Sequence, residues 1–256
     1  MFLGWRANIR VFCLSSFLLV LAGCAGMSEP QPEITRVAEL NVRLGLDYLR
    51  QERFQLAKTK LERALSASPH SSQVQWAYAL LQDKLGHEEA AERHFRKAIS
   101  LSPNDAYAHN NYGSFLCRQG KVKKGLAEFD KAGTNPLYPE PESAWVNAGI
   151  CLIRSSEDDV SAEEAEQYFR KALEENPEYV LALYQMAALT SRQQRYLASR
   201  AYRQRLAEAL QRDDPKVLWL CVVTESALNN DSEAARCAAT LKTDFPTSRE
   251  TALLYQ

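Results

Sequence analysis

From about residue 38 onward, apolar residues recur along the chain at intervals of mostly three and four. Such intervals place side chains on one face of an α-helix, as in an amphipathic helix packed against a core. One run consists of Leu40, Leu44 and Tyr48, and the next consists of Leu56, Leu61 and Leu65. No segment of useful length alternates between apolar and polar residues, so the pattern predicts paired helices and no sheet.

A longer period of about 34 residues is superimposed on the helical one. Leu-Gly-x-x-Tyr, then Ala, a large apolar residue, Ala and Pro recur in this order, first as Leu44-Gly45-Leu46-Asp47-Tyr48, Ala57, Leu61, Ala64 and Pro69. This period and this order of small, aromatic and proline positions are typical of the tetratricopeptide repeat, a helix–turn–helix unit. We therefore predict an all-α fold, a right-handed tetratricopeptide superhelix (α-solenoid) of about six repeats.

Six repeats account for most of the chain. They are predicted at 38–71, 72–105, 106–139, 142–179, 180–213 and 215–248, and residues 249–256 form a C-terminal cap in which Leu253, Leu254 and Tyr255 cover the last apolar face. The fourth repeat is about four residues too long, and its extra length falls in the polar segment 155–159, where an insertion between two helices costs little. The fifth repeat is degenerate, because it has no alanine at the usual last position.

Small residues and prolines recur at fixed places within the repeats. Small side chains are expected where helices cross closely, at Gly45, Ala79, Gly113, Gly149 and Ala187 on first helices and at Ala57, Ala91, Gly125, Ala165 and Ser199 on second helices. The second helices are expected to end before Pro69, Pro103, Pro177 and Pro246, because proline lacks a backbone donor and restricts the residue before it.

The N-terminal segment has the layout of a secretory signal peptide. Arg6 and Arg10 precede an apolar run from Val11 to Leu21, and the run ends in Leu21-Ala22-Gly23-Cys24, which resembles the bacterial lipobox. The interpretation is a signal peptide over 1–23 that is removed, a lipidated Cys24, and a flexible tether over 24–37. The alternative, an uncleaved anchor helix, is disfavoured because the apolar run is only about half of the ~20 residues that a span needs.

The residue after the lipobox cysteine bears on localisation. An aspartate at that place resembles an inner-membrane retention signal, whereas this chain has Ala25. We therefore expect a lipid-anchored protein of the outer membrane that faces the periplasm.

Charge and motifs argue against several functions. The net charge is −1, and removal of residues 1–23 would take away two arginines and no acidic residue, so no basic surplus remains to bind nucleic acid. Phosphate loops, nucleophile elbows and zinc-protease motifs are absent from the sequence. The four histidines, His70, His87, His94 and His109, are interpreted as surface residues. We therefore predict no enzyme, catalytic residue, metal, cofactor or small-molecule substrate, and a protein partner instead.

Four cysteines remain after the lipidated one. Cys117 and Cys151 fall near the ends of first helices in adjacent repeats, and Cys221 and Cys237 fall on the two helices of repeat six. Export would place them in an oxidising compartment, so both pairs are candidate disulfides. Buried free thiols are the alternative for each pair.

The first helices are expected to line a groove for a partner protein. Matching repeat positions gives Gln73, Trp76, Leu80, Tyr107, Asn110, Asn111, Ser114, Val146, Asn147 and Gln185 as groove candidates, with Ser143 and Ile150 beside them. Asn111, Asn147 and Gln185 occupy one equivalent position, where an amide ladder can pair with the backbone of an extended peptide. The alternative is that these amides bond only across adjacent helices. Few Lys or Arg residues fall at these positions, so the groove suits an amphipathic segment better than a C-terminal carboxylate.

Three segments resemble one family closely. Asn110-Asn111-Tyr112-Gly113-Ser114-Phe115-Leu116-Cys117, Asn135-Pro136-Leu137-Tyr138-Pro139 and Asn147-Ala148-Gly149-Ile150-Cys151 resemble the type IV pilus biogenesis and stability lipoproteins, the PilW/PilF pilotins. The resemblance implies a lipid-anchored scaffold that holds secretin subunits and promotes their localisation and multimerisation in the outer membrane. It also implies a disulfide between Cys117 and Cys151. Val222, where a small glycine is expected, is a departure from the family pattern in the last repeats.

Two functions follow from these observations. The first is the pilotin, which binds the type IV pilus secretin and thereby supports pilus biogenesis, pilus stability and twitching motility. The alternative is a tetratricopeptide lipoprotein scaffold of another envelope machine, for β-barrel assembly or cell-wall synthesis. The repeats leave no room for a separate catalytic domain.

Overall fold

The computed structural model describes residues 34–155 and 159–255. The predicted signal peptide, the lipidation site at Cys24 and most of the tether lie outside these ranges. The helices are α1 (Arg36–Arg50), α2 (Phe54–Ala67), α3 (Ser72–Lys84), α4 (Glu88–Leu101), α5 (Ala106–Arg118), α6 (Val122–Gly133), α7 (Pro141–Ser155), α8 (Asp159–Glu175), α9 (Val180–Arg192), α10 (Tyr196–Leu210), α11 (Pro215–Ala227), α12 (Asp231–Asp244) and α13 (Arg249–Leu253). No strand occurs within the described ranges.

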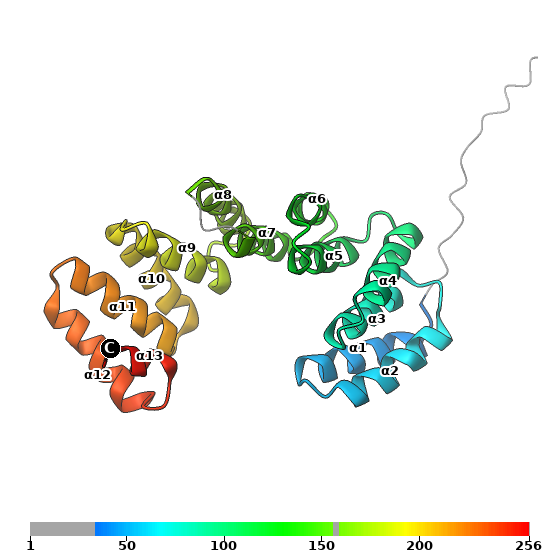
Figure 1. The fold of residues 1–256 in the computed structure, drawn as a ribbon, viewed down its shortest axis with the longest axis horizontal. Coiled ribbons are helices and arrows are strands. Elements are labelled where there is room, and N and C mark those ends of the chain that lie inside the picture. The colour runs from blue at the N-terminus through cyan, green and yellow to red at the C-terminus, as the bar shows by residue number, and fades with distance from the viewer. Residues whose placement is uncertain (1–33, 156–158, 256) are drawn as a thin grey trace, which may run out of the picture. The chain divides into compact units, whose positions relative to one another are not determined.

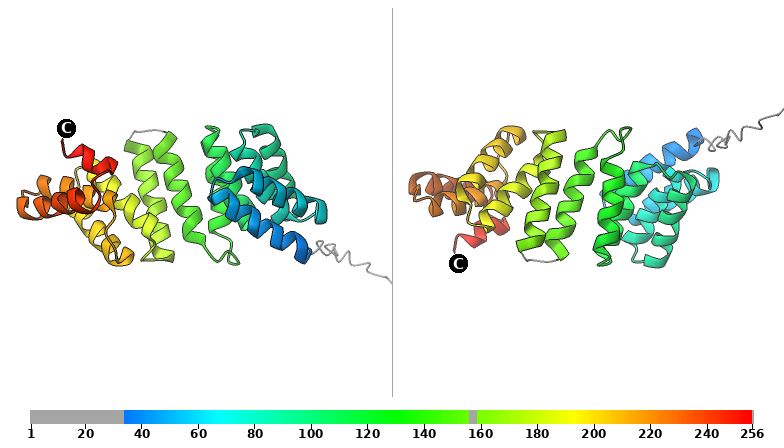
Figure 2. Two further views of the ribbon diagram at one scale, coloured as in Figure 1. Left: turned by 90° about the horizontal axis from the view of Figure 1, so that it is seen from below. Right: turned by 90° about the horizontal axis from the view of Figure 1, so that it is seen from above.

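Successive helices form pairs, and each pair packs on the next (Figures 1 and 2). The first helices α1, α3, α5, α7, α9 and α11 also contact one another in sequence order. The all-α solenoid of helix pairs predicted from the sequence is therefore confirmed. Helix α1 begins at Arg36, two residues before the first repeat was expected to start, because the side chain of Thr35 accepts a hydrogen bond from the amide of Ala38 and caps the helix there. None of the described helices is both long and apolar enough to cross a membrane.

Proline marks the ends of the second helices as expected. The helices α2, α4, α8 and α12 each end two residues before Pro69, Pro103, Pro177 and Pro246. After three of these four prolines the next helix begins behind a side-chain cap: Ser71 caps α3, Asp105 caps α5 and Ser248 caps α13, whereas α9 has no side-chain cap. The end of one repeat and the start of the next are thus both set by local sequence.

The small residues lie where helices cross closely. A methyl group added at Gly125 would come within 2.5 Å of the Cys117 sulfur and 3.0 Å of the Gly113 carbonyl oxygen. A methyl group added at Gly149 would come within 2.4 Å of the Phe169 ring. These contacts are shorter than van der Waals distances, so the helix pairs of repeats three and four depend on the absence of a side chain at these positions.

One position on the second helices holds a large, fully buried apolar side chain in each of the first four repeats. Leu61, Phe95, Phe129 and Phe169 occupy it in the first four repeats, and none is more than 1% exposed. In the fifth repeat the same position is Arg203, which is 7% exposed. A guanidinium group therefore stands in the core of the fifth repeat where the first four repeats have an apolar side chain.

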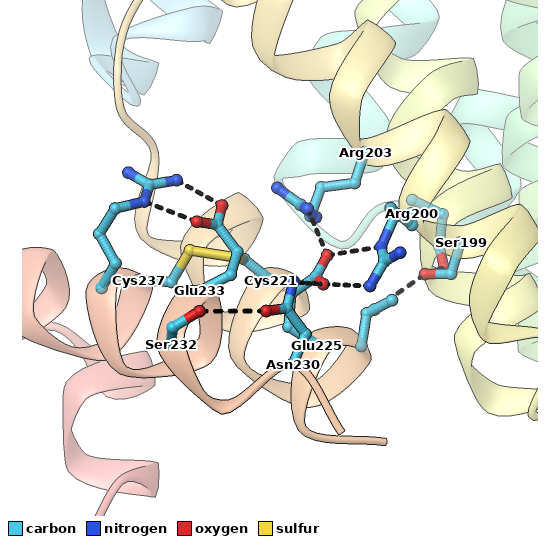
Figure 3. Close-up of polar contacts among 12 residues, drawn as sticks. Ser199, Arg200, Arg203, Cys221, Glu225, Asn230, Ser232, Glu233 and Cys237 are labelled. Atoms are coloured by element: carbon cyan, nitrogen blue, oxygen red, sulfur yellow. Dashed lines mark hydrogen bonds and ion pairs between the residues drawn. A yellow bond between two sulfur atoms is a disulfide. The ribbon is translucent and has the colours of Figure 1, made fainter. Parts of the chain in front are cut away.

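The buried charge of Arg203 is balanced by Glu225 of α11 (Figure 3). One guanidinium nitrogen of Arg203 lies 2.8 Å from the Glu225 carboxylate, which is 1% exposed. Arg200 binds the same carboxylate through two nitrogens, and the Asn230 amide donates to it at 2.9 Å. Burial by itself raises the pKa of Glu225, but the hydrogen bonds from Arg200, Asn230 and Arg203 outweigh it and lower the pKa. Repeats five and six are thus joined by a buried ionic network.

The C-terminal end of the solenoid is covered by α13, which packs on α11 and α12. Thr251 is buried there, and its hydroxyl donates to the carbonyls of Leu241 and Phe245 at 3.0 and 2.7 Å. Leu254 packs on the apolar cluster formed by α11 and α12, but Tyr255 is 73% exposed. Thr251 is thus the buried residue of this C-terminal segment, whereas Leu253 and Leu254 are half-buried and Tyr255 does not cover the core.

The ionic network leads to a prediction about stability. Glu225→Gln leaves two guanidinium groups facing a neutral amide in a buried site, so the free energy of unfolding is expected to fall by about 3–5 kcal/mol. In the wild type this contribution is present above the unfolded pKa of about 4.3 and is lost as pH falls through the lower folded pKa. Chemical denaturation between neutral and acidic pH measures both effects.

Glu233→Gln is the matched control. Glu233 also pairs with an arginine, Arg236, but its side chain is 31% exposed. The loss of a partly exposed pair is expected to cost under about 1 kcal/mol. Equal effects of the two variants would contradict a structural role for the buried network.

Candidate partner-binding surface

A cleft with apolar walls lies between the first helices of the N-terminal repeats. It has a volume of about 410 Å³ and is lined by Leu46, Leu49, Arg50, Glu52, Phe54, Trp76, Leu80, Lys84 and Asn111. The walls come from α1, α3 and the start of α2, and Asn111 of α5 closes one side. Charged side chains of both signs accompany the apolar walls. The cleft can therefore take an apolar side chain and pair with charges next to it.

Trp76 also lines a second cleft between α3 and α5. This cleft has a volume of about 410 Å³, and its other lining residues are Gln73, Asp105 and Tyr107. The rings of Trp76 and Tyr107 stack with centroids 6.2 Å apart, and Tyr107 meets Tyr138 edge to face at 5.0 Å. Tyr107 is 39% exposed, so the row of rings that joins repeats two and three has an accessible face. Rings held by their neighbours offer contact area with little loss of side-chain entropy on binding.

A third cleft, of about 390 Å³, lies between α5 and α7. It is lined by Ser114, Cys117, Arg118, Asn147, Ile150, Cys151 and Arg154. Arg118 is paired with Asp83 of α3. This cleft is therefore more polar than the two clefts nearer the N-terminus.

The predicted groove residues divide into three groups. Gln73, Trp76, Leu80, Tyr107 and Asn111 line the two N-terminal clefts, and Ser114, Asn147 and Ile150 line the third. Gln185 is half-buried on α9 and lines none of these three clefts. Val146 is fully buried in the core, so its assignment to the groove was wrong, because this residue points into the packing of repeat four.

Asn110 is buried too, and its amide is used within the protein. The amide nitrogen donates to the Tyr138 hydroxyl at 3.0 Å and to the Ser143 hydroxyl at 3.3 Å. The side-chain amide of Asn147 donates to the side-chain oxygen of Asn110, Oδ1, at 3.0 Å. This network joins α5 to α7, and burial raises the pKa of the Tyr138 hydroxyl within it.

The two asparagines of the predicted amide ladder, Asn111 and Asn147, make different hydrogen bonds. Asn111 donates to the Tyr107 carbonyl of its own helix at 2.8 Å, whereas Asn147 bonds across to the neighbouring helix through Asn110. The two equivalent asparagines therefore do not bond to each other. One Asn147 donor is already engaged, which leaves the ladder fewer groups for a peptide backbone.

Sequence matching missed several residues of the first cleft. Leu46 and Leu49 belong to the apolar pattern of α1, and Phe54 begins α2, but only the packing of α1 against α3 brings them together with Trp76. The groove candidates predicted from the sequence begin with repeat two. Applying the same match to repeat one would have found Leu46, because it precedes Leu80 by one repeat period.

The structure joins the four described cysteines in two pairs. Cys117 of α5 bonds to Cys151 of α7 with their Cα atoms 5.7 Å apart, and Cys221 of α11 bonds to Cys237 of α12 with Cα atoms 6.2 Å apart. The first pair links adjacent repeats, and the second links the two helices of repeat six (Figure 3). Glu233 lies close to the second pair, but its carboxylate binds Arg236 and both sulfur atoms are bonded to each other, so these three residues are not a metal site in this state.

The histidines differ from the expectation of surface residues. His70 and His87 are exposed and His94 is half-buried, but His109 is 3% exposed. Its Nδ1 lies 2.5 Å from a Glu128 carboxylate oxygen and its Nε2 lies 2.8 Å from the Pro103 carbonyl oxygen. Both partners accept hydrogen bonds, so both ring nitrogens must donate and the ring is an imidazolium. The surface interpretation of His109 was therefore wrong.

The repeat period explains why His109 is buried. Gln75 stands one period earlier, and its amide nitrogen donates to the Pro69 carbonyl at 2.6 Å while its oxygen accepts from His94 at 2.7 Å. The same position thus ties each first helix to the preceding junction and to its own second helix. Burial by itself lowers the pKa of His109, but the hydrogen bonds to Glu128 and Pro103 outweigh it and raise the pKa.

Comparisons with known proteins agree with this architecture. Models of the tetratricopeptide repeat match residues 42–105 and 94–127. The chain is 26% identical over 241 residues to the type IV pilus assembly protein PilF of Pseudomonas aeruginosa, covering 91% of this chain and 94% of that protein. It is 29% identical over 144 residues to an uncharacterised protein of Haemophilus influenzae, covering 56% of this chain and 80% of that protein.

Two solved structures extend the likeness to the fold. The crystal structure of PilW, described as a widely conserved type IV pilus biogenesis factor, matches with a TM-score of 0.74 and 27% identity over 87% of this chain and 100% of that chain. The structure of Pseudomonas aeruginosa PilF matches with a TM-score of 0.70 and 25% identity over 86% of this chain and 96% of that chain. The protein is a tetratricopeptide-repeat protein. It is homologous to PilF and matches PilW in structure, and both are type IV pilus biogenesis proteins.

His109 gives a prediction about pH. Because its folded pKa is raised, its contribution to stability is present below the unfolded pKa of about 6.5 and is lost as pH rises through the folded pKa. His109→Gln places in repeat three the residue that repeat two already has, so it is expected to keep the fold and to remove this pH dependence. Unfolding measured from pH 6 to pH 9 tests it, and an unchanged pH profile would contradict an imidazolium at this site.

The disulfides give a second prediction. Mass mapping of peptides from the exported protein without reducing agent is expected to recover Cys117 with Cys151 and Cys221 with Cys237. The first bond closes a sequence separation of 34, so replacing both of its cysteines by serine is expected to lower the free energy of unfolding by about 3–4 kcal/mol in the chain-entropy account. Recovery of free thiols at Cys117 and Cys151 in exported protein would refute the pair.

Proposed function

We propose that this protein is a non-enzymatic, lipid-anchored scaffold of type IV pilus assembly, a pilotin that binds subunits of the pilus secretin. The proposal is supported above all by the match over nearly the whole chain to PilF and PilW. A likeness confined to single repeats would indicate only a tetratricopeptide fold, because such folds serve many functions. Here the likeness covers 91% of this chain.

The apolar cleft of the first two repeats is the proposed site for the secretin. Leu46, Leu80 and Phe54 supply apolar walls, and Trp76 lies between this cleft and the next one. An amphipathic segment can place its apolar side chains between these walls while its polar side pairs with Arg50 and Lys84. Trp76 is only 7% exposed in the free protein, so it supports the walls of the two clefts, and Tyr107, which is 39% exposed, offers the accessible ring.

The proposed anchor is the lipidated Cys24. Several acyl chains hold a protein on a bilayer far more firmly than one chain does, because each buried CH₂ contributes about 0.8 kcal/mol. A secretin subunit bound in the cleft is then carried with the lipoprotein to the outer membrane. This localisation rests on the lipobox and on Ala25 in the sequence.

Leu80→Glu tests the cleft. It puts a carboxylate among the apolar walls, where desolvation opposes binding, so affinity for the secretin is expected to fall at least about tenfold. Heat-stable secretin multimers and twitching motility should decrease with it. Leu197→Glu is the matched control, since Leu197 is 70% exposed on α10, away from the cleft.

Three further measurements bear on the proposal. Thermal unfolding must show that both glutamate variants are folded, so that a difference between them reports binding. A strain that lacks the gene but keeps normal secretin multimers would overturn the secretin assignment. Cys24→Ser tests the anchor separately, and continued fractionation with the outer membrane would show that lipid is not what holds the protein there.

A further inference from the structure

The two ends of the solenoid differ. At the C-terminal end, α13 covers the last helix pair. At the N-terminal end, the outer face of α1 is uncovered within the described residues and carries Val37 and Leu40, which are 51% and 56% exposed, with the half-buried Leu44 one turn further on. The intervals of three and four residues place these side chains in one stripe along the helix.

The position of Leu40 is buried in repeats two to five. The residues equivalent to Leu40 are Val74, Ala108, Ala144 and Ala182, and all four are 0% exposed because the preceding repeat packs on them. Repeat one has no preceding repeat, yet it carries a leucine there. Terminal repeats normally present a polar outer face, since an apolar one lowers solubility. The stripe is therefore a surface that needs a cover.

Charged residues border the stripe on one side. Arg36, Arg43 and Arg50 follow at intervals of seven residues, and each is exposed. Glu39 lies 3.9 Å from Arg43, and Asp47 pairs with Arg50, so three guanidinium groups and two carboxylates share this border. An apolar stripe flanked by arginines is the arrangement of a helix that lies in a membrane interface, with leucines among acyl chains and guanidinium groups at the phosphates.

The sequence places this helix next to the proposed anchor. Eleven residues, 25–35, separate Cys24 from the first residue of α1. Fully extended, they span at most about 40 Å, so a lipidated Cys24 keeps α1 within that distance of the bilayer. A second copy is a poorer cover, because stable dimers bury about 800 Å² per partner over some 20–30 residues, far more than this stripe offers.

We propose that the Val37–Leu40–Leu44 stripe docks on the surface of the phospholipid bilayer. The acyl chains then hold the protein, and α1 fixes the orientation of the first repeat against the membrane. This inference rests on the lipid anchor of the proposed function but not on the secretin. It assigns to Val37, Leu40 and Leu44 a lipid contact, and none of these three residues lines the partner cleft, although Arg50 borders both surfaces.

Hydroxyl-radical footprinting of side chains tests the docking. The acylated protein in vesicles of phosphatidylethanolamine and phosphatidylglycerol is compared with the Cys24→Ser protein free of lipid. Oxidation of Val37 and Leu40 is expected to fall at least about threefold on the vesicles. Leu137 and Leu197 are internal controls, because they are 88% and 70% exposed and lie in other repeats, and their oxidation is expected to stay the same.

A variant makes the test specific. Leu40→Asp in the acylated protein places a carboxylate in the stripe, so oxidation of Val37 is expected to return to its lipid-free rate while the acyl chains keep the protein on the vesicles. Equal oxidation of Val37 and Leu40 with and without vesicles would overturn the proposal. Val37 and Leu40 already protected in the lipid-free protein would also overturn it and would identify the N-terminal segment as the cover.

Protection that rises with protein concentration in the absence of lipid would instead identify a second copy, and it too would overturn the proposal. No secretin is present, so a failed secretin assignment leaves these outcomes unchanged. If the exported protein carries no acyl mass at Cys24, the anchor and the docking both fail, whereas the cleft variants still report on partner binding.

Discussion

Close contact between helices at small residues is the constraint on which this structure depends. A helix pair of about 34 residues cannot bury its apolar face alone, so each pair must stack on its neighbours. Stacking at this distance requires positions without bulk. Gly125 faces both a sulfur of one disulfide and the backbone of Gly113, and Gly149 faces the Phe169 ring. Close helix contacts of this kind recur with the repeat period, and each contact depends on its own pair of residues.

Polar groups replace apolar ones in this scheme only where a partner is supplied. Arg203 stands where other repeats have a phenylalanine or leucine, and Glu225 from the next repeat neutralises it. His109 stands where repeat two has a glutamine, and Glu128 keeps it charged. In both cases the substitution is compensated by a second change on a packed helix, because an unpaired buried charge would cost several kcal/mol. These compensations make the repeats distinct from one another and fix which helix packs on which.

The surfaces follow from the same stacking. Where first helices meet, their side chains leave clefts, and Trp76 of α3 and Tyr107 of α5 both line one of them. Where stacking stops, a face that is buried in inner repeats becomes free. The C-terminal end has α13 to cover it, and the N-terminal end has the Val37–Leu40–Leu44 stripe. A solenoid therefore offers two kinds of binding surface, one along the first helices and one at its ends.

The sequence by itself determined the elements and their order. The period of small and apolar residues predicted the helix pairs, and the prolines predicted where second helices end, because both signals act within a few residues of backbone. The resemblance to pilus lipoproteins was also present in short segments. Tertiary structure alone decided which side chains face a cleft, a core or a charge. Asn110 and Val146 occupy the position that Trp76 has in repeat two, and all three are buried, whereas Tyr107 on the same helix as Asn110 is 39% exposed and lines a cleft. The pairing of Arg203 with Glu225 across 22 residues could not be read from either residue, since it depends on how α10 packs against α11.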